Sequence, residues 1–240
     1  MATIQRRRLI LSSASPAPVS PIIAANPVLN LDADNVLLNG SRVVSNPENT
    51  VFQPTASLQP LLVTNAINGH NLIRFEGSQG LNTNLEYLSR TNTVATVFIV
   101  CRKENDIDTG FPMHSDNTVT GQSSQGFSLI VNAGGSGATR FRSGGNVINI
   151  VQPTTPILIT LRIDRPSNFM GLSINNDDEV TNTPGTFANN EILTIGYRTP
   201  SSPAVFLRGD IPALAVFNRL TTTEETNNIK QFLINKYALI

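Results

Sequence analysis

Apolar residues in this chain come in short runs separated by turn-forming residues. Residues 94–101 are apolar on both alternating faces, as expected for a strand that is covered on both sides. Further apolar runs occupy residues 127–131, 157–163, 171–174, 192–196 and 211–217. Glycine, asparagine and aspartate between these runs are typical of turns. Because strands recur without helices between them, the pattern predicts an all-β protein: a two-sheet antiparallel jelly-roll sandwich.

One helix is predicted, at the C-terminal end over residues 222–237. Its start fits a capping box, in which Thr221 accepts from a free amide and Glu224 reaches back. One apolar face follows from the helical spacing of Ile229, Phe232, Leu233 and Tyr237. We expect this face to lie against the sandwich, with Tyr237 in the core.

Residues 1–28 differ from the rest and predict an extended arm, followed by one domain over residues 29–240. Four prolines among serine and alanine favour an extended backbone without a core of its own. Arg6, Arg7 and Arg8 form the one concentrated charge of the chain. We expect this triplet to anchor the arm on an acidic partner surface, with a solvated tail as the alternative.

The charge balance argues against two classes of partner. Lys+Arg and Asp+Glu number 17 each, so no overall field favours nucleic acid or an anionic membrane.

No stretch reaches the ~18 apolar residues that a membrane helix requires. The apolar run after Arg8 is too short for a signal peptide. With only Cys101 available, which excludes an intrachain disulfide, we expect assembly in a cytoplasm.

The residues predict no catalytic apparatus. Glycoside hydrolysis needs two carboxylates facing one sugar bond, and no predicted strand carries acidic residues two or four apart on one face. The sequence has no G-x-S-x-G motif, which would place the nucleophilic serine of a catalytic triad. The two histidines, His70 and His114, are far apart and have no companions at metal-ligand spacing. We expect His70 in a turn after Asn68 and Gly69, and Cys101 as a packed core thiol.

Calcium is the one cofactor that the sequence leaves open. The oxygen-rich places are Asp32 with Asp34, Asp106 with Asp108, and residues 177–179. None reproduces the D-x-[DN]-x-[DN]-G loop of a calcium site. Residues 177–179 lie at a hairpin tip, and we expect a structural role for Asp32 and Asp34. The prediction is therefore no cofactor and no metal site.

Four motifs in order resemble the concanavalin-A-like, laminin-G-like family found in many bacterial and phage proteins. They are Leu-Asp-Ala-Asp at 31–34, Asn-Gly-His-Asn-Leu-Ile-Arg-Phe-Glu-Gly at 68–77, Thr-Val-Phe-Ile-Val at 96–100, and a closing segment over 195–221 that leads to Asn-Lys-Tyr at 235–237. The resemblance covers residues 29–240 and implies a jelly-roll sandwich. Tryptophans common in the family are absent, and Pro212 stands where it has alanine.

The resemblance implies a non-enzymatic structural protein of a bacteriophage virion. A capsid decoration (cement) protein or a tail-fibre or adaptor subunit would fit, as a homo-oligomer held in the virion by its arm. The alternative is a carbohydrate-binding, lectin-like module, whose ligand-binding residues stay open. Sugar recognition favours exposed aromatics, and the chain has no tryptophan and three tyrosines, Tyr87, Tyr197 and Tyr237. A hydrolase or lyase is disfavoured by the missing carboxylate pair.

Overall fold

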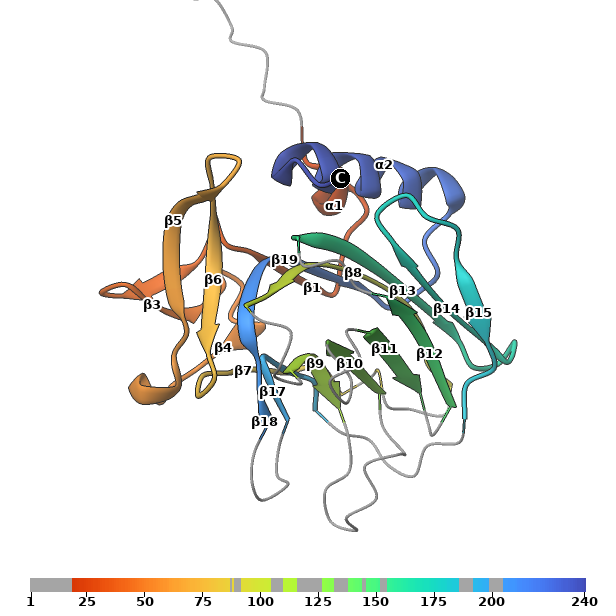
Figure 1. Ribbon diagram of the computed structural model, residues 1–240, viewed down its shortest axis with the longest axis horizontal. Coiled ribbons are helices and arrows are strands. Elements are labelled where there is room, and N and C mark those ends of the chain that lie inside the picture. The colour runs from red at the N-terminus through yellow and green to blue at the C-terminus, as the bar shows by residue number, and fades with distance from the viewer. Residues whose placement is uncertain are drawn as a thin grey trace, which may run out of the picture.

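The computed structural model describes residues 19–86, 88, 92–104, 110–115, 127–131, 138–143, 146–151, 155–185, 192–198 and 205–240. The predicted anchor Arg6, Arg7 and Arg8 lies outside the described residues, as do Asp106 and Asp108. The described part is a β-sandwich with a helix at its C-terminal end, which confirms the predicted fold class. Figure 1 shows two stacked sheets and a helical layer above the upper one.

The first sheet is the upper one in Figure 1. In hydrogen-bonded order it contains β15 (Val180–Asn182), β14 (Phe169–Ile174), β13 (Ile157–Asp164), β8 (Val94–Lys103) and β19 (Arg208–Phe217). The free side of β19 is shared by β1 (Leu29–Asp32) and β6 (His70–Glu76), and β6 pairs in turn with β5 (Leu61–Ile67).

The second sheet lies below the first. Its strands, in order, are β12 (Asn146–Val151), β11 (Ala138–Ser143), β10 (Phe127–Val131), β9 (Gly110–Ser115), β16 (Thr194–Ile195), β7 (Leu81–Thr83) and β4 (Val51–Phe52). The hairpin of β2 (Leu37–Asn39) and β3 (Arg42–Ser45) joins the two sheets, because β3 pairs with both β4 and β5. A short hairpin of β17 (Tyr197–Arg198) and β18 (Val205–Phe206) and a 3-10 turn, η1 (Ala56–Leu58), complete the strands and turns described.

Strand β8 shows why its residues are apolar on both faces. Val97, Ile99 and Cys101 point into the core between the sheets, whereas Phe98 and Val100 point toward the helical layer. Alternating side chains of one strand therefore serve two separate apolar layers. Cys101 is buried, and burial raises the pKa of its thiol to about 12, so it is a packed thiol as predicted.

Helix α2 (Thr223–Tyr237) covers the outer face of the first sheet through its apolar side. Its capping box lies one residue later than predicted: Thr222 accepts from the Glu225 amide, and Glu225 accepts from the Thr222 amide. A second helix that the sequence did not predict, α1 (Pro21–Ala24), lies within the predicted arm and packs beside α2. Among the described residues, no helix is long and apolar enough to span a membrane.

Candidate functional site

The outer face of the second sheet carries a row of polar side chains. Leu129 and Met113 point into the core, so their strand neighbours Ser128 and His114 point outward. The strand register places Ser128 between His114 and Arg142, and Thr194 between His114 and Asn82. We call the five residues Asn82, Thr194, His114, Ser128 and Arg142 the outer-face row.

Aromatic side chains lie beside this row because β9 contains a bulge. Val131 pairs with Gly110 and Leu129 with Met113, so β9 holds one extra residue over this stretch. Gly110 and Met113 both face the core, and a side chain at Gly110 would meet Leu207 at 2.8 Å. The bulge therefore leaves Phe111 on the outer side, where it packs against Ile130 and Val205.

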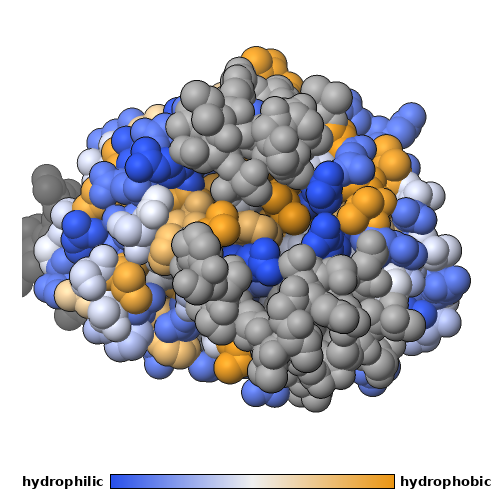
Figure 2. All heavy atoms as spheres, turned by 60° about the horizontal axis from the view of Figure 1, so that its bottom comes forward, coloured by the Kyte–Doolittle hydropathy of each residue, from blue (hydrophilic) through white to orange (hydrophobic). Residues whose placement is uncertain are grey.

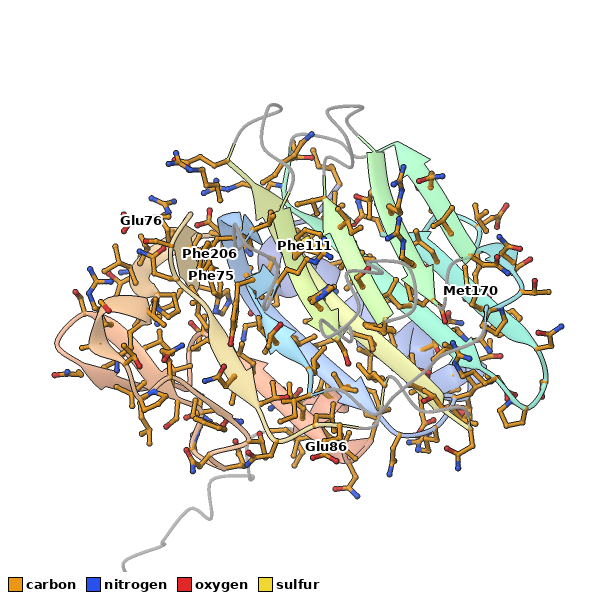
Figure 3. The ribbon with its side chains drawn as sticks, turned by 90° about the horizontal axis from the view of Figure 1, so that it is seen from below. Phe75, Glu76, Glu86, Phe111, Met170 and Phe206 are labelled. Atoms are coloured by element: carbon orange, nitrogen blue, oxygen red, sulfur yellow. The ribbon has the colours of Figure 1, made fainter. Side chains whose placement is uncertain are left out.

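The hairpin β17–β18 extends this aromatic cluster. The Tyr197 and Phe206 rings stack, with centroids 6.0 Å apart, and the Tyr197 hydroxyl hydrogen-bonds Asn82 of the row. The guanidinium carbon of Arg198 lies 5.7 Å from the centre of the Phe111 ring. Figure 3 looks onto the molecule from below and labels Phe111 and Phe206 in this region. Figure 2 shows hydrophobic and hydrophilic residues next to one another in the coloured part of this underside.

His114 lies at the centre of the row, and its imidazole is buried. Its side chain contacts the Phe111 ring edge-on, with centroids 5.2 Å apart, and the residue is only 3% exposed. Both ring nitrogens, Nδ1 and Nε2, are buried and have no hydrogen-bond partner among the described residues. Burial, together with the charges of Arg198 and Arg142, lowers the pKa of His114 to about 3. The imidazole is therefore neutral at ordinary pH, with one donor and one acceptor nitrogen unsatisfied.

An unsatisfied polar group of this kind calls for an explanation. Leaving one buried donor or acceptor unpaired costs about 1–3 kcal/mol, so native proteins keep such groups rare. Water or a ligand hydroxyl can supply both missing hydrogen bonds, since a hydroxyl donates and accepts. The surroundings offer further contacts of the same type: a serine hydroxyl at Ser128 and two guanidinium groups at Arg142 and Arg198. The outer-face row therefore combines buried hydrogen-bonding groups, since His114, Ser128 and Thr194 are each at most 6% exposed.

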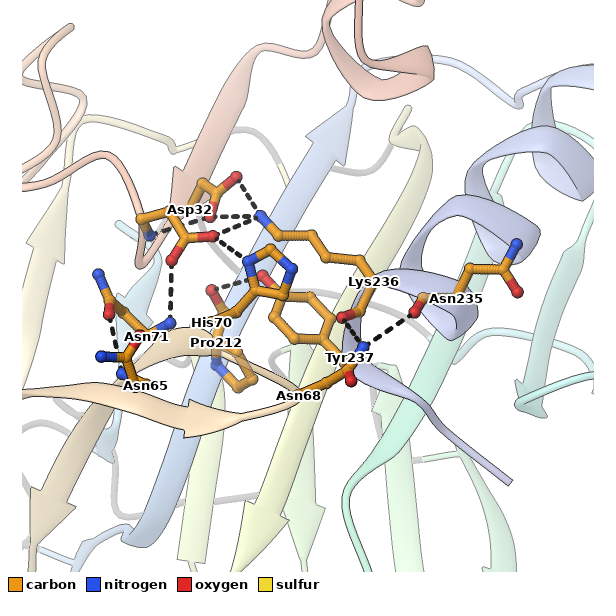
Figure 4. A network of polar contacts seen from close by, with 10 residues as sticks. Asp32, Asn65, Asn68, His70, Asn71, Pro212, Asn235, Lys236 and Tyr237 are labelled. Carbon is orange, nitrogen blue, oxygen red and sulfur yellow. Dashed lines mark hydrogen bonds and ion pairs between the residues drawn. The ribbon is translucent and has the colours of Figure 1, made fainter.

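A second cluster of charged residues joins α2 to the sandwich (Figure 4). Lys236 lies 2.8 Å from Asp32 Oδ2 and 3.0 Å from Asp34 Oδ2, and its side chain is 11% exposed. His70 Nδ1 lies 2.7 Å from Asp34 Oδ2, and the Asn71 amide donates to the other oxygen of Asp34. The structural role expected for Asp32 and Asp34 agrees with this geometry. We call these residues the helix clamp.

The helix clamp also brings together three of the motifs on which the family resemblance rests. Asn68 donates to the carbonyl oxygens of Asn235 and Lys236, and the Tyr237 hydroxyl donates to the Pro212 carbonyl. Burial would raise the pKa of Asp34, but hydrogen bonds from Asn71, Lys236 and His70 outweigh it and lower that pKa. Each charged member faces an opposite charge or a hydrogen-bond donor, so the cluster is complete without a ligand.

The other acidic residues considered in the sequence do not form a metal site in the described chain. Glu179 accepts from Arg162 at 3.1 Å, and Asp177 and Asp178 lie in the turn before β15. No group of three His, Cys, Asp or Glu side chains with metal-binding geometry occurs among the described residues. Neither the outer-face row nor the hairpin β17–β18 contains a carboxylate side chain.

The sequence analysis did not find the outer-face row. It placed no strand at residues 110–115, where the structure has β9. Proline is uncommon inside a central strand, and Pro112 lies in the middle of this one. His114 was noted only as a histidine without metal-ligating companions. Its neighbours come from five different strands, and the bulge that exposes Phe111 has no simple sequence signal. The one available signal was a histidine directly after the apolar run from Phe111 to Met113.

Solved structures with the same fold include carbohydrate-binding domains. The CBM40 of the Ruminococcus gnavus IT-sialidase matches 67% of this chain and 96% of its own, with a TM-score of 0.51 and 14% identity. The same CBM40 bound to α2,3-sialyllactose matches 64% of this chain and 92% of its own, with a TM-score of 0.50 and 15% identity.

A longer match is the botulinum neurotoxin serotype D ligand-binding domain in complex with N-acetylneuraminic acid. It covers 90% of this chain and 53% of its own, with a TM-score of 0.58 and 13% identity. At these identities the likeness shows a shared jelly-roll-like β-sandwich fold. No family model matches the chain. No curated protein sequence matches it either.

Proposed function

We propose that this protein is a non-enzymatic, lectin-like carbohydrate-binding module that holds its glycan on the outer-face row. The observation that carries this proposal is His114, a buried neutral histidine whose two ring nitrogens both lack hydrogen-bond partners in the part of the chain that the structure describes. A sugar hydroxyl that donates to one nitrogen, with a second hydroxyl that accepts from the other, would satisfy both.

The surroundings of His114 suit sugar recognition in two further ways. Sugar rings present apolar C–H faces that stack on aromatic side chains, and Phe111, Tyr197 and Phe206 gather beside the row. Ser128, Asn82 and the arginines supply hydrogen-bonding groups next to these rings. The three neighbouring structures described above are sugar-binding domains or complexes by their own descriptions, which supports this function over others open to the fold.

Binding without turnover is the simplest chemistry for this face. Glycoside hydrolysis requires a carboxylate pair at the sugar bond. The sequence places no carboxylate side chain in the outer-face row or in the hairpin β17–β18. We therefore propose a binding role, and measurable turnover of a bound polysaccharide would contradict it.

The virion role expected from the family resemblance remains a prediction. None of the neighbouring structures described above is a phage protein. A glycan-binding sandwich anchored by Arg6, Arg7 and Arg8 would still fit a larger homo-oligomeric assembly. Replacing the triplet by three alanines and measuring particle size by light scattering tests that anchor separately from sugar binding, because the triplet lies outside the outer-face row.

A glycan array with the full chain tests the proposed function, followed by an NMR titration with the best sugar. We expect saturable binding, with the largest amide shifts at His114, Ser128 and Thr194. His114→Leu should abolish it, whereas the matched variant His70→Leu in the helix clamp should leave it unchanged. Absence of binding to any glycan, or shifts confined to the helix clamp, would contradict the proposal.

A further inference from the structure

We propose that Asn68 is a site of spontaneous deamidation, and that this reaction is coupled to the docking of helix α2. The site lies at the tip of the β5–β6 hairpin, beside the C-terminal end of α2, and the inference is independent of the proposed function. Asn68 is exposed and is followed by Gly69. Asparagine is a thermolabile residue, and a following glycine leaves its backbone nitrogen unhindered for attack on the asparagine side chain.

Asn68 and Gly69 form the two-residue turn of this hairpin. Ile67 pairs with His70, and both turn residues are left-handed, with φ of 47° at Asn68 and 78° at Gly69. These angles are typical of a type I′ turn, for which Asn-Gly is a preferred sequence. The turn chemistry accounts for the dipeptide, and the turn presents the Asn68 side chain to the end of α2 (Figure 4).

The Asn68 side chain caps the C-terminal end of α2. Its Nδ2 donates to the Lys236 carbonyl at 2.9 Å and to the Asn235 carbonyl at 3.4 Å. The last four carbonyls of a helix have no amide partner within the helix, and they carry a partial negative charge. Ala238 ends α2 in the left-handed conformation, which is unfavourable for a residue other than glycine. The end of α2 is therefore held partly by a donor from another element.

Deamidation turns this donor into an acceptor. The Gly69 backbone nitrogen attacks Cγ of Asn68, the Cγ–Nδ2 bond breaks, and Nδ2 leaves as ammonia with the proton of the Gly69 amide. Water then opens the succinimide ring to aspartate or isoaspartate, and no oxidant or reductant is needed. The new carboxylate has no N–H and faces two carbonyl oxygens at the negative end of the helix. The reaction should therefore weaken the docking of α2, which covers Phe98 and Val100 of the first sheet.

The same hydrogen bonds should slow the reaction. Attack requires the side-chain amide to turn toward the Gly69 nitrogen, so the bonds from Asn68 to the end of α2 must break first. Asn39 and Gly40 form the only other Asn-Gly sequence of the chain. Asn39 is exposed in β2, and its side chain has no hydrogen bond to another described residue. Asn39 is therefore an internal reference for Asn68.

The first test follows both sites by mass spectrometry of peptides from the full chain, after incubation in mildly alkaline buffer with and without concentrated urea. In urea the two sites should react at similar rates. In the folded protein we expect folding to slow Asn68 about two- to tenfold more than Asn39, the factor that corresponds to one net hydrogen bond. Equal slowing, or stronger slowing at Asn39, would overturn the protection by α2.

Weakening the helix clamp should remove the protection. In Lys236→Met we expect Asn68 to react about twofold or more faster than in the wild type. Asn39 should keep its rate, which reports that the variant is folded. An unchanged rate at Asn68 in the folded variant would contradict the coupling. If both rates rise to those in urea, the variant has unfolded, and the wild-type comparison with Asn39 decides.

Two substitutions separate the product of the reaction from simple loss of the donor. Asn68→Asp places a carboxylate at the turn, and Asn68→Gly removes the amide but keeps the left-handed turn. Hydrogen exchange measured by NMR should become about two- to tenfold faster for the amides in the last turn of α2, and more so in Asn68→Asp. Asn39→Asp introduces the same charge at the other turn and should leave these amides unchanged. Unchanged exchange in Asn68→Asp would show that deamidation does not affect docking, and would overturn the inference.

Discussion

Two regions of the molecule place a histidine among charged side chains, and they differ in whether its imidazole has a hydrogen-bond partner. In the helix clamp, His70 lies 2.7 Å from an Asp34 oxygen, and the same carboxylate pairs with Lys236. On the outer-face row, His114 is more deeply buried, has cations for neighbours, and its ring makes no hydrogen bond to any described residue. The first arrangement stabilises the fold by itself, whereas the second leaves two buried polar atoms unpaired among the described residues.

At neutral pH, the comparison predicts that the substitution with the largest effect on stability lies in the helix clamp. Lys236→Met leaves the carboxylates of Asp32 and Asp34 close together without the ammonium between them. We expect a loss of about 2 kcal/mol in the free energy of unfolding, less than for a fully buried pair because the carboxylates are partly exposed. Urea denaturation measures it. Lys230→Met, which removes a hydrogen bond to Ser173 and the weaker attraction of Glu179 and Asp177, is the matched control and should cost clearly less. Equal losses would mean that the clamp contributes little.

The two regions should also respond to acid in separate pH windows. The pKa of folded His114 is about 3, against 6.5 ordinarily, so below pH 6.5 the unfolded chain takes up a proton that the folded chain does not. The free energy of unfolding should therefore decrease as the pH is lowered below 6.5. This group contributes up to about 1.4 kcal/mol of that decrease per pH unit.

For Asp34 the pKa in the folded protein is lowered from its ordinary 3.8. Its contribution to the free energy of unfolding is therefore fully present above pH 3.8. It is lost only as the pH falls further, through the folded pKa. Unfolding free energies measured from pH 7 to pH 4 in wild type and His114→Leu should show a shallower slope in the variant. Parallel slopes would exclude His114 as the cause.

The smallest predicted changes in the free energy of unfolding come from replacing each of the two histidines by leucine. His114→Leu removes two unsatisfied polar atoms from a buried position, so we expect a gain of about 1 kcal/mol in the free energy of unfolding, together with the loss of glycan binding. His70→Leu loses the contact with Asp34 and should cost about 1 kcal/mol without affecting binding. For these two variants, chemical denaturation measures the free energy of unfolding, and titration calorimetry measures glycan binding. A destabilised His114→Leu protein would show that the imidazole is satisfied in the folded state.

Much of the fold could be predicted from local pattern. The run of residues 94–101, apolar on both faces, predicted a strand covered on both sides, and β8 has that environment. The helix was predicted over 222–237 and begins at Thr223, with the capping residues one position later than expected. The neighbouring threonines 221–223 offer the same capping chemistry, and only packing of the helix on the first sheet selects one of them. Helix α1 was missed because four residues carry too little periodicity.

The candidate site could not be predicted in this way. Asn82 and Thr194 are more than a hundred residues apart in the chain, yet they are register partners beside His114. The bulge in β9 then decides that Phe111 faces outward with His114.

The sequence by itself determined the fold class, because the two-residue period of strands and the apolar face of a helix are local properties of the chain. It also determined that the chain has few charges and two histidines. Only the tertiary structure decided which histidine is satisfied. Whether a ring nitrogen finds a partner depends on side chains from distant strands, such as Asp34 for His70 and the two arginines around His114. That contrast locates the proposed site on the second sheet.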